Sequence, residues 1–341
     1  MTARRLAAAL VLVVVAGLVL PHAAHAWTPG THIYLGESVL ANLGLLPAAV
    51  ADLIRAFPFD FLYGNIAADS SMAKKYAPVG RHCHYWHVGQ EIHDLAESDA
   101  LRAFGLGYLC HLSADTIAHN YFVPRQLMLT AATPGVGHSY WESRVEVHLG
   151  DAWARLARDV ILLDHRHADA HMDRIIAPTI FSVRTNRRLF RGMVHVTESQ
   201  SWQRSMQIAR ERSRWELTDE DVEGHLAFAL EYMIDMLTGF VGEQVAGGVC
   251  VDPACRALDP SGESALKAAK QMRREVLREA GRRDRDRLRE AAQEHFGLPT
   301  RGLVHWPRLE TRLPWGTATP PAPQPTLLLG PHGGPIRSTA V

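Results

Sequence analysis

The residues of this sequence that are best suited to chemistry are histidines and carboxylates gathered in its first half. They are His32, Asp69, His84, His111, Asp115, His119, His138 and Glu142, and they begin shortly after Trp27. Imidazole nitrogens and carboxylate oxygens are ligands that zinc and similar divalent ions favour in proteins. Because one ion needs fewer donors than this, the set predicts a site that holds several metal ions.

The strongest local motif is the run His111-Leu-Ser-Ala-Asp115-Thr-Ile-Ala-His119. Side chains four residues apart lie on one face of a helix, so these three can converge on one wall of a site. Their neighbours are apolar, which favours metal binding over a solvated helix face. His138 and Glu142 repeat the spacing and offer a second wall.

Other ligand-rich stretches are less clear from their spacing. His82, His84 and His87 follow the turn that ends at Asp69, and the local pattern does not decide which of them binds metal. The histidines of this set that do not bind metal would instead form hydrogen bonds to residues that do. His165, His167, Asp169, His171 and Asp173 form another ligand-rich run with a spacing of two, and such a spacing does not place side chains on one helix face. We therefore expect an exposed polar connection over residues 165–173.

The elements that position these residues are predicted to be helices, since helical spacing dominates and alternating strand patterns are scarce. We expect helices over residues 33–56 with a break near Gly44 and Pro47, over 99–121, from about 140 to 163, and over 263–296 along the body. Thr218 and Asp221 predict a capping box that begins a further helix. The predicted fold is mainly α, a multi-helix single domain with the metal cluster between helices.

The chain begins with a pattern typical of an export signal. Arg4 and Arg5 precede an apolar run over residues 6–20, and Ala24-His25-Ala26 is a small-x-small cleavage site. Cleavage after residue 26 makes Trp27 the mature N-terminus and predicts a periplasmic or secreted protein. No later segment is apolar enough to span a bilayer, so no transmembrane anchor is expected after processing. We divide the rest into a helical zinc-binding catalytic domain (27–250), a helical extension packed on the body (251–300) and a Pro/Gly-rich, disordered tail (301–341).

The composition excludes some partners. The chain has 36 Lys and Arg against 36 Asp and Glu, so no overall field attracts nucleic acid, and no stable nucleic-acid complex is expected. The four cysteines allow three disulfide pairings that the sequence does not separate. Cys250 and Cys255 are spaced to close a small loop, whereas Cys83 and Cys110 each precede a candidate metal histidine.

Taken in order, these motifs resemble the zinc-dependent phospholipase C family, whose superfamily includes single-strand-specific zinc nucleases. The resemblance covers roughly residues 27–150 and implies three zinc ions. It assigns Asp69, His84, His111 and Asp115 to one ion, and His119, His138 and Glu142 to the second. The amine and carbonyl of Trp27, with His32 and a bridging Asp115, would hold the third. Better-known members leave a longer gap between the positions of Asp115 and His119, which predicts altered helix geometry at the second site.

The activity implied by the resemblance is cleavage of a phospholipid to diacylglycerol and a phosphorylated headgroup. A hydroxide generated at the zinc ions would attack phosphorus, with Asp69 as the catalytic residue that orients or deprotonates the water. Arg81 stands where choline-specific members carry an aromatic residue, and Lys74 is close by, so phosphatidylcholine is not expected to be the preferred lipid. Lys74, Arg81 and Tyr85 are the candidate substrate-binding residues.

Two other functions fit the same residues. The spacing from Trp27 to His32 is more like that of the nucleases. In a nuclease, bases could stack on aromatic rings near the metals, and the candidates are Tyr85, Trp86, Tyr121, Phe122, Tyr140 and Trp141. Packing in the core is an alternative role for these rings. A non-catalytic, zinc-stabilised binding protein is the second alternative. Since catalytic sites leave a position for water, the three donors His119, His138 and Glu142 favour an enzyme.

Overall fold

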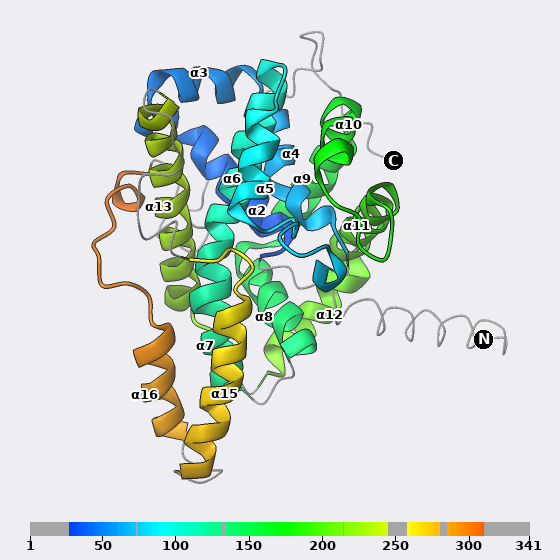
Figure 1. Cartoon of the computed structure of the whole chain (residues 1–341). Helices are drawn as coiled ribbons and strands as arrows, with labels where there is room; N and C mark the ends of the chain where they lie inside the picture. Colours follow the sequence, from blue (N-terminus) through cyan, green and yellow to red (C-terminus); the bar gives the residue numbers. More distant parts are fainter. Residues whose placement is uncertain are drawn as a thin grey trace, which may run out of the picture.

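The computed structural model of the protein describes residues 27–72, 74–130, 134–213, 215–244, 258–279 and 285–309. Within these ranges every regular element is a helix, which confirms the predicted mainly α fold (Figure 1). The predicted export signal and the pair Cys250 and Cys255 lie outside the described residues. Cys83 and Cys110 are buried, unpaired thiols. In the part of the chain that is described, no helix has the length and apolar character needed to cross a bilayer.

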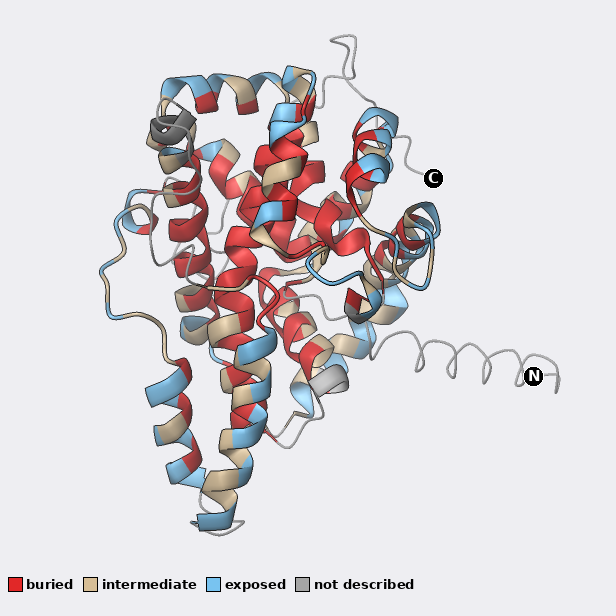
Figure 2. Cartoon of the chain, in the orientation of Figure 1, coloured by how far each residue is buried: buried red, intermediate tan, exposed pale blue. Residues whose placement is uncertain are grey.

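Helix α6 (Asp99–Ile117) is the centre of the fold, with α4 (Pro58–Ala67), α5 (Trp86–Asp94) and α13 (Asp219–Gln244) packed against it. The side chain of Ser98 caps its first turn by accepting a hydrogen bond from the backbone N–H of Leu101. Nearly every residue of α6 is buried (Figure 2). A helix with so little charge can be surrounded by others on all sides, and this places its polar residues inside the protein.

The N-terminal part of the described chain follows the predicted pattern closely. Helix α2 (Pro29–Ala41) is capped by Thr28 and is followed by the 3-10 turn η2 (Leu43–Leu45) and by α3 (Ala48–Ala56), so the break predicted near Gly44 and Pro47 is present. After α4 come two short 3-10 turns, η3 (Ala68–Ser70) and η4 (Lys74–Tyr76). The stretch before Asp69 is thus the end of a helix, where the sequence indicated a turn.

Two expectations for the middle of the chain were wrong. The helix expected from 140 to 163 is two helices, α8 (Pro134–Leu149) and α9 (Asp151–Ile161), because Gly150 adopts a left-handed φ of 89° between them. Residues 165–173, expected to be an exposed connection, lie mostly in α10 (Arg166–Ile175). Their side chains serve packing: Asp169 accepts a hydrogen bond from Tyr63 and pairs with Arg187, and buried His171 contacts the carbonyl of Ile92.

The C-terminal part contains α11 (Val183–Glu198), α12 (Gln200–Glu211) and α13, where the predicted capping hydrogen bond from Asp221 N–H to Thr218 is present. The helix expected over 263–296 is two helices, α15 (Glu263–Glu279) and α16 (Arg285–Phe296), and both pack on α7 (Val123–Leu129). Figure 1 shows them side by side at one end of the molecule.

The predicted tail is partly folded. Residues 301–309 include the turn η6 (Trp306–Arg308), and the side chains of Trp306 and Leu309 are buried. The carboxylate of Glu231 on α13 accepts hydrogen bonds from the backbone N–H groups of His305 and Trp306. These contacts explain why residues 301–309 pack against α13. Residues 310–341 lie outside the described part of the chain.

Candidate metal centre

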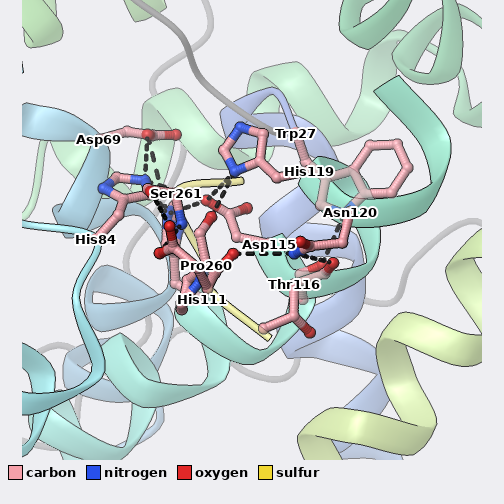
Figure 3. A network of polar contacts seen from close by, with 12 residues as sticks. Trp27, Asp69, His84, His111, Asp115, Thr116, His119, Asn120, Pro260 and Ser261 are labelled. Carbon is pink, nitrogen blue, oxygen red and sulfur yellow. Dashed lines mark hydrogen bonds and ion pairs between the residues drawn. The ribbon is translucent and has the colours of Figure 1, made fainter. Parts of the chain in front are cut away.

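Five helical segments and the residues just before α5 bring the predicted donors to one place in the interior. Helix α2 supplies His32, η3 supplies Asp69, α6 supplies His111 and Asp115, and the π-helical turn η5 (Ala118–Phe122) supplies His119. His138 and Glu142 come from α8, and His84 lies just before α5. All eight residues are at most 2 % exposed, and Figure 3 shows several of them turned toward one another. Buried ionisable groups are costly unless they are paired or bind a metal, so this concentration needs an explanation.

The first group of donors has the dimensions of a zinc site. Nε2 of His84 lies 3.1 Å from Asp115 Oδ2, 3.3 Å from Asp69 Oδ1 and 3.2 Å from His111 Nε2. Nε2 of His111 lies 3.2 Å from Asp115 Oδ2 and 3.9 Å from Asp69 Oδ1. Ligand atoms about 2.0–2.1 Å from a zinc ion are separated by roughly 3.3–3.4 Å along the edges of a tetrahedron. The separations among His84, His111 and Asp115 match these edges, and Asp69 adds an oxygen 3.3 Å from His84 Nε2 and 3.9 Å from His111 Nε2.

The rings of this group are oriented by contacts on their other nitrogens. Nδ1 of His111 lies 2.8 Å from the carbonyl oxygen of Asn65, which can only accept, so Nδ1 carries the hydrogen and Nε2 keeps its lone pair. Nδ1 of His84 lies 3.1 Å from the Cys83 sulfur. Such partners are typical of ligand histidines, since they fix the tautomer and the direction of the ring.

Asp115 connects the first group to His32. Its Oδ1 lies 3.3 Å from His32 Nε2, while its Oδ2 belongs to the first group, and the rings of His32 and His111 are stacked with centroids 3.9 Å apart. Burial alone would raise the pKa of Asp115, but His111, His32 and His84 hold it well below the usual range. Burial lowers the pKa of His32 to about 4. At neutral pH these residues are a carboxylate and a neutral imidazole, the forms that bind metal.

His84 shows that metal binding at this centre is coupled to protons. Burial and Lys74 lower its pKa, but Cys83 and the carboxylates of Asp115 and Asp69 outweigh them and raise it well above its usual value. A metal ion bound here must displace the proton that His84 holds in the metal-free protein.

The second group consists of His119, His138 and Glu142, whose candidate ligand atoms lie within 4.8 Å of one another. Nε2 of His138 lies 2.8 Å from Glu142 Oε1, and the rings of His119 and His138 are 5.0 Å apart. The π-helical turn η5 contains His119, which confirms the altered helix geometry expected at this point. A π turn is wider than an α turn and rotates the following side chains, and such turns are common at functional sites.

His119 is held in one orientation by a distant part of the chain. Its Nδ1 donates to the carbonyl oxygen of Pro260 at 2.5 Å, which leaves Nε2 with its lone pair. Burial lowers the pKa of His119 to about 3. The ring is therefore neutral and able to bind metal at physiological pH.

Trp27 lies beside α6 next to the cluster. Its indole Nε1 donates to the carbonyl oxygen of Ala114 at 3.3 Å, the residue before Asp115, and its ring centroid is 5.1 Å from that of Phe122. The Trp27 side chain is fully buried, and Figure 3 shows it beside Asp115 and His119. These contacts anchor residue 27 at the cluster, and ligation by its backbone amine and carbonyl stays a prediction.

Of the three candidate substrate-binding residues, Lys74 contacts the cluster directly. Its Nζ lies 2.9 Å from Asp69 Oδ1 and 3.1 Å from His84 Nε2, and its side chain is buried. The guanidinium of Arg81 instead binds Glu91 at 2.6 Å and the carbonyl of Ile175 at 2.7 Å. Within the described residues the guanidinium of Arg81 pairs with these two groups, so the structure does not bring Arg81 to Asp69.

The neighbours of His84 are directed elsewhere. Nδ1 of His82 accepts a hydrogen bond from the backbone N–H of His84, and Nε2 of His87 lies 2.6 Å from the carbonyl of Gly80. The Tyr85 ring lies 5.3 Å from His82 and 5.5 Å from His87. Of the three histidines that follow Asp69, His84 is thus the one that faces Asp69 and Asp115.

Comparison with known families agrees with this arrangement. The family model described as "Zinc dependent phospholipase C" matches residues 31–183. This segment is a zinc-dependent phospholipase C family domain. It contains every predicted donor except Trp27, and the all-helical fold is the one expected for the family. Comparisons with curated proteins and with solved structures gave no match. Family membership makes a zinc-dependent hydrolase the activity that the domain implies.

Sequence reasoning missed the groups that orient the ligands. The carbonyls of Asn65 and Pro260 hold His111 and His119, and they lie 46 and 141 residues away from them along the chain. Every residue has a backbone carbonyl, so nothing in the sequence singles these out. The Cys83 sulfur, by contrast, is adjacent to His84, and its position was a usable signal.

Proposed function

We propose that this chain is an exported zinc-dependent phosphodiester hydrolase of phospholipase C type. It would cleave a phospholipid to diacylglycerol and a phosphorylated headgroup, and it would bind three zinc ions. The sites are assigned as the family resemblance implies. Asp69, His84, His111 and Asp115 form the first, and His119, His138 and Glu142 form the second. The backbone of Trp27, His32 and bridging Asp115 form the third.

The observation that carries this proposal is the close approach of three donors of the first group, His84, His111 and Asp115. Two imidazole Nε2 atoms face each other at 3.2 Å, each within 3.2 Å of one carboxylate oxygen of Asp115. Neutral imidazole lone pairs repel at this distance unless a proton or a cation lies between them. The second group offers three donors, and this leaves a ligand position for water or substrate, as in catalytic zinc sites.

The roles of the chain's own residues follow from their positions. Bound zinc ions supply water of lowered pKa and neutralise charge on phosphoryl oxygens. Asp69 has one oxygen in the first group and would orient or deprotonate the attacking water. Lys74 places a buried ammonium 2.9 Å from Asp69, where it can bind a non-bridging phosphate oxygen as a point charge. The buried walls around these groups exclude bulk water and strengthen both interactions.

The test uses the chain that begins at Trp27. Zinc content per chain is measured by plasma mass spectrometry, and hydrolysis is measured on mixed micelles of phospholipids and on single-stranded DNA and RNA. We expect close to three zinc ions and zinc-dependent release of phosphorylated headgroup. Asp115→Asn should lower both the zinc content and the rate of hydrolysis, because Asp115 contributes one oxygen to the first site and the other to the third. Asp52→Asn is the matched control, since Asp52 is an exposed carboxylate on α3.

The other functions are outcomes of the same measurement. Cleavage of single-stranded nucleic acid with lipid untouched would make the protein a nuclease, although full burial of Phe122 and Trp141 removes two of the rings on which bases could stack. Zinc loss that unfolds the protein, with no phosphodiester cleaved by the loaded chain, would make the metals structural. Full zinc occupancy with no turnover of any phospholipid would refute the proposal.

A further inference from the structure

A short segment from outside the family domain lies against the second metal group. Residues 258–262, here called the C-terminal strap, precede α15 and lie beyond the matched residues 31–183. Three consecutive carbonyl oxygens of the strap accept hydrogen bonds from side chains of α5 and η5. Trp86 Nε1 donates to Leu258 O at 3.0 Å, Asn120 Nδ2 to Asp259 O at 2.9 Å, and His119 Nδ1 to Pro260 O at 2.5 Å. Figure 3 shows Pro260 beside the cluster.

The strap also has its own internal support. The Asp259 carboxylate accepts hydrogen bonds from the backbone N–H of Ser261 at 3.0 Å and from the Ser261 hydroxyl at 2.5 Å. Pro260 restricts the backbone further, because its ring fixes φ. The carbonyl that faces His119 is therefore presented by a stiff turn, and a stiff partner orients a ring better than a mobile one.

Close packing at Gly262 fixes the distance between the strap and η5. Gly262 has a φ of 60°, and a Cβ at this position would lie 2.3 Å from His119 Cβ and 2.6 Å from the His119 carbonyl oxygen. The carbonyl oxygen belongs to the backbone and Cβ is bonded directly to it, so no side-chain rotation moves either atom away. Any larger residue at 262 must push the strap away from His119 and lengthen the hydrogen bond that His119 Nδ1 donates to the Pro260 carbonyl oxygen.

We propose that the C-terminal strap is a positioning element of the second zinc site, which it completes by holding His119 in the tautomer that directs Nε2 toward His138 and Glu142. The inference rests on the proposed function, since it assumes that these three residues bind zinc. It adds that residues outside the family domain set the zinc affinity of that site. Pro260, through its carbonyl, and Gly262, through its lack of a side chain, are the positioning residues.

The experiment compares Gly262→Ala with Gly302→Ala, because a Cβ at Gly302 meets no atom within 4 Å and Gly302 also lies beyond the family domain. Zinc binding is titrated against a competing chelator, and imidazole ¹⁵N shifts of the metal-free proteins report the tautomer of each histidine. Gly262→Ala should weaken one zinc ion by about 10- to 100-fold, the usual effect of losing the partner of a ligand histidine. The His119 signal should shift from a single Nδ1–H tautomer toward a mixture. Gly302→Ala should behave as the wild type.

A second variant guards against a simple folding defect. Trp86→Phe removes the hydrogen bond to Leu258 while it keeps an aromatic ring, so it should loosen the strap and weaken the same zinc ion by a smaller factor. Equal zinc affinities and an unchanged His119 tautomer in Gly262→Ala would overturn the strap proposal alone. A wild-type chain that binds no zinc at His119, His138 and Glu142 would overturn the proposed function and the strap proposal together. A loss of all zinc ions in both Gly262→Ala and Trp86→Phe would show a general structural role instead.

Discussion

The contact between α4 and α6 gives the sharpest test of how the fold positions the metal centre. A Cβ at Gly107 on α6 would lie 2.0 Å from the carbonyl oxygen of Phe61 on α4. Carbon and carbonyl oxygen atoms approach comfortably to about 3.3 Å. Gly107→Ala therefore requires α4 to move by about 1.3 Å, the difference between these distances. No side-chain rotation relieves the clash, because the atom opposite belongs to the backbone.

This movement reaches the first metal group directly. Helix α4 carries the Asn65 carbonyl, which accepts from His111 Nδ1 at 2.8 Å, and it leads into Asp69. A shift of about 1.3 Å would lengthen that hydrogen bond beyond its range. Overpacking costs roughly 1–3 kcal/mol, and a lost buried hydrogen bond adds about 1 kcal/mol. We expect the melting temperature to fall by about 5–12 °C and activity to fall by up to about 100-fold, a loss that a 1 Å misplacement of catalytic groups can cause.

Gly192→Ala is the matched control for this substitution. Gly192 lies within α11, and a Cβ there meets no atom within 4 Å, so the change should stabilise the protein by about 0.4–1 kcal/mol. Thermal unfolding, zinc content and phospholipid hydrolysis are measured on both variants. The reasoning is refuted if Gly107→Ala melts at the same temperature as Gly192→Ala and keeps full zinc content.

Three further predictions concern the charges and the metals. Lys74→Met should raise KM about 10- to 100-fold, since it removes a charge-assisted contact to phosphate of about 1.5–3 kcal/mol; an unchanged KM would exclude Lys74 from substrate binding. Burial lowers the pKa of His225 to about 4, so below pH 6.5 the unfolded chain binds a proton that the folded chain does not, and stability falls by about 1.4 kcal/mol per pH unit down to pH 4. The free energy of unfolding of the metal-free protein is measured with denaturant at pH 7.5 and 5.5. It should change less between these pH values in His225→Leu than in His295→Leu, a control at an exposed site. An equal change in the two variants would contradict this prediction. Removing zinc with a chelator should lower the melting temperature, because ions that bind only the folded state stabilise it; an unaltered melting curve would mean that the wild type held no zinc.

The sequence determined the helical class and the central helix of this protein. The apolar run over residues 99–121 has too few charges to face solvent, and α6 with η5 occupies this stretch in the middle of the bundle. Thr218 and Asp221 marked the start of α13 because capping depends only on neighbouring residues. Local rules were wrong where a contact with a distant element decided the outcome. Residues 165–173 form a helix because Asp169 pairs with Tyr63 and Arg187 from other helices.

For the candidate site, the sequence determined the kinds of donor and their spacing within each helix. His111 and Asp115 share one face of α6 because they are four residues apart, and no tertiary contact is needed for that. Only the tertiary structure decided which of His82, His84 and His87 faces Asp115, and that Lys74 reaches Asp69. It also decided that the Pro260 carbonyl orients His119 from 141 residues away. The physical reason is that side-chain identity sets local chemistry, whereas distances between remote segments are set by how whole helices pack.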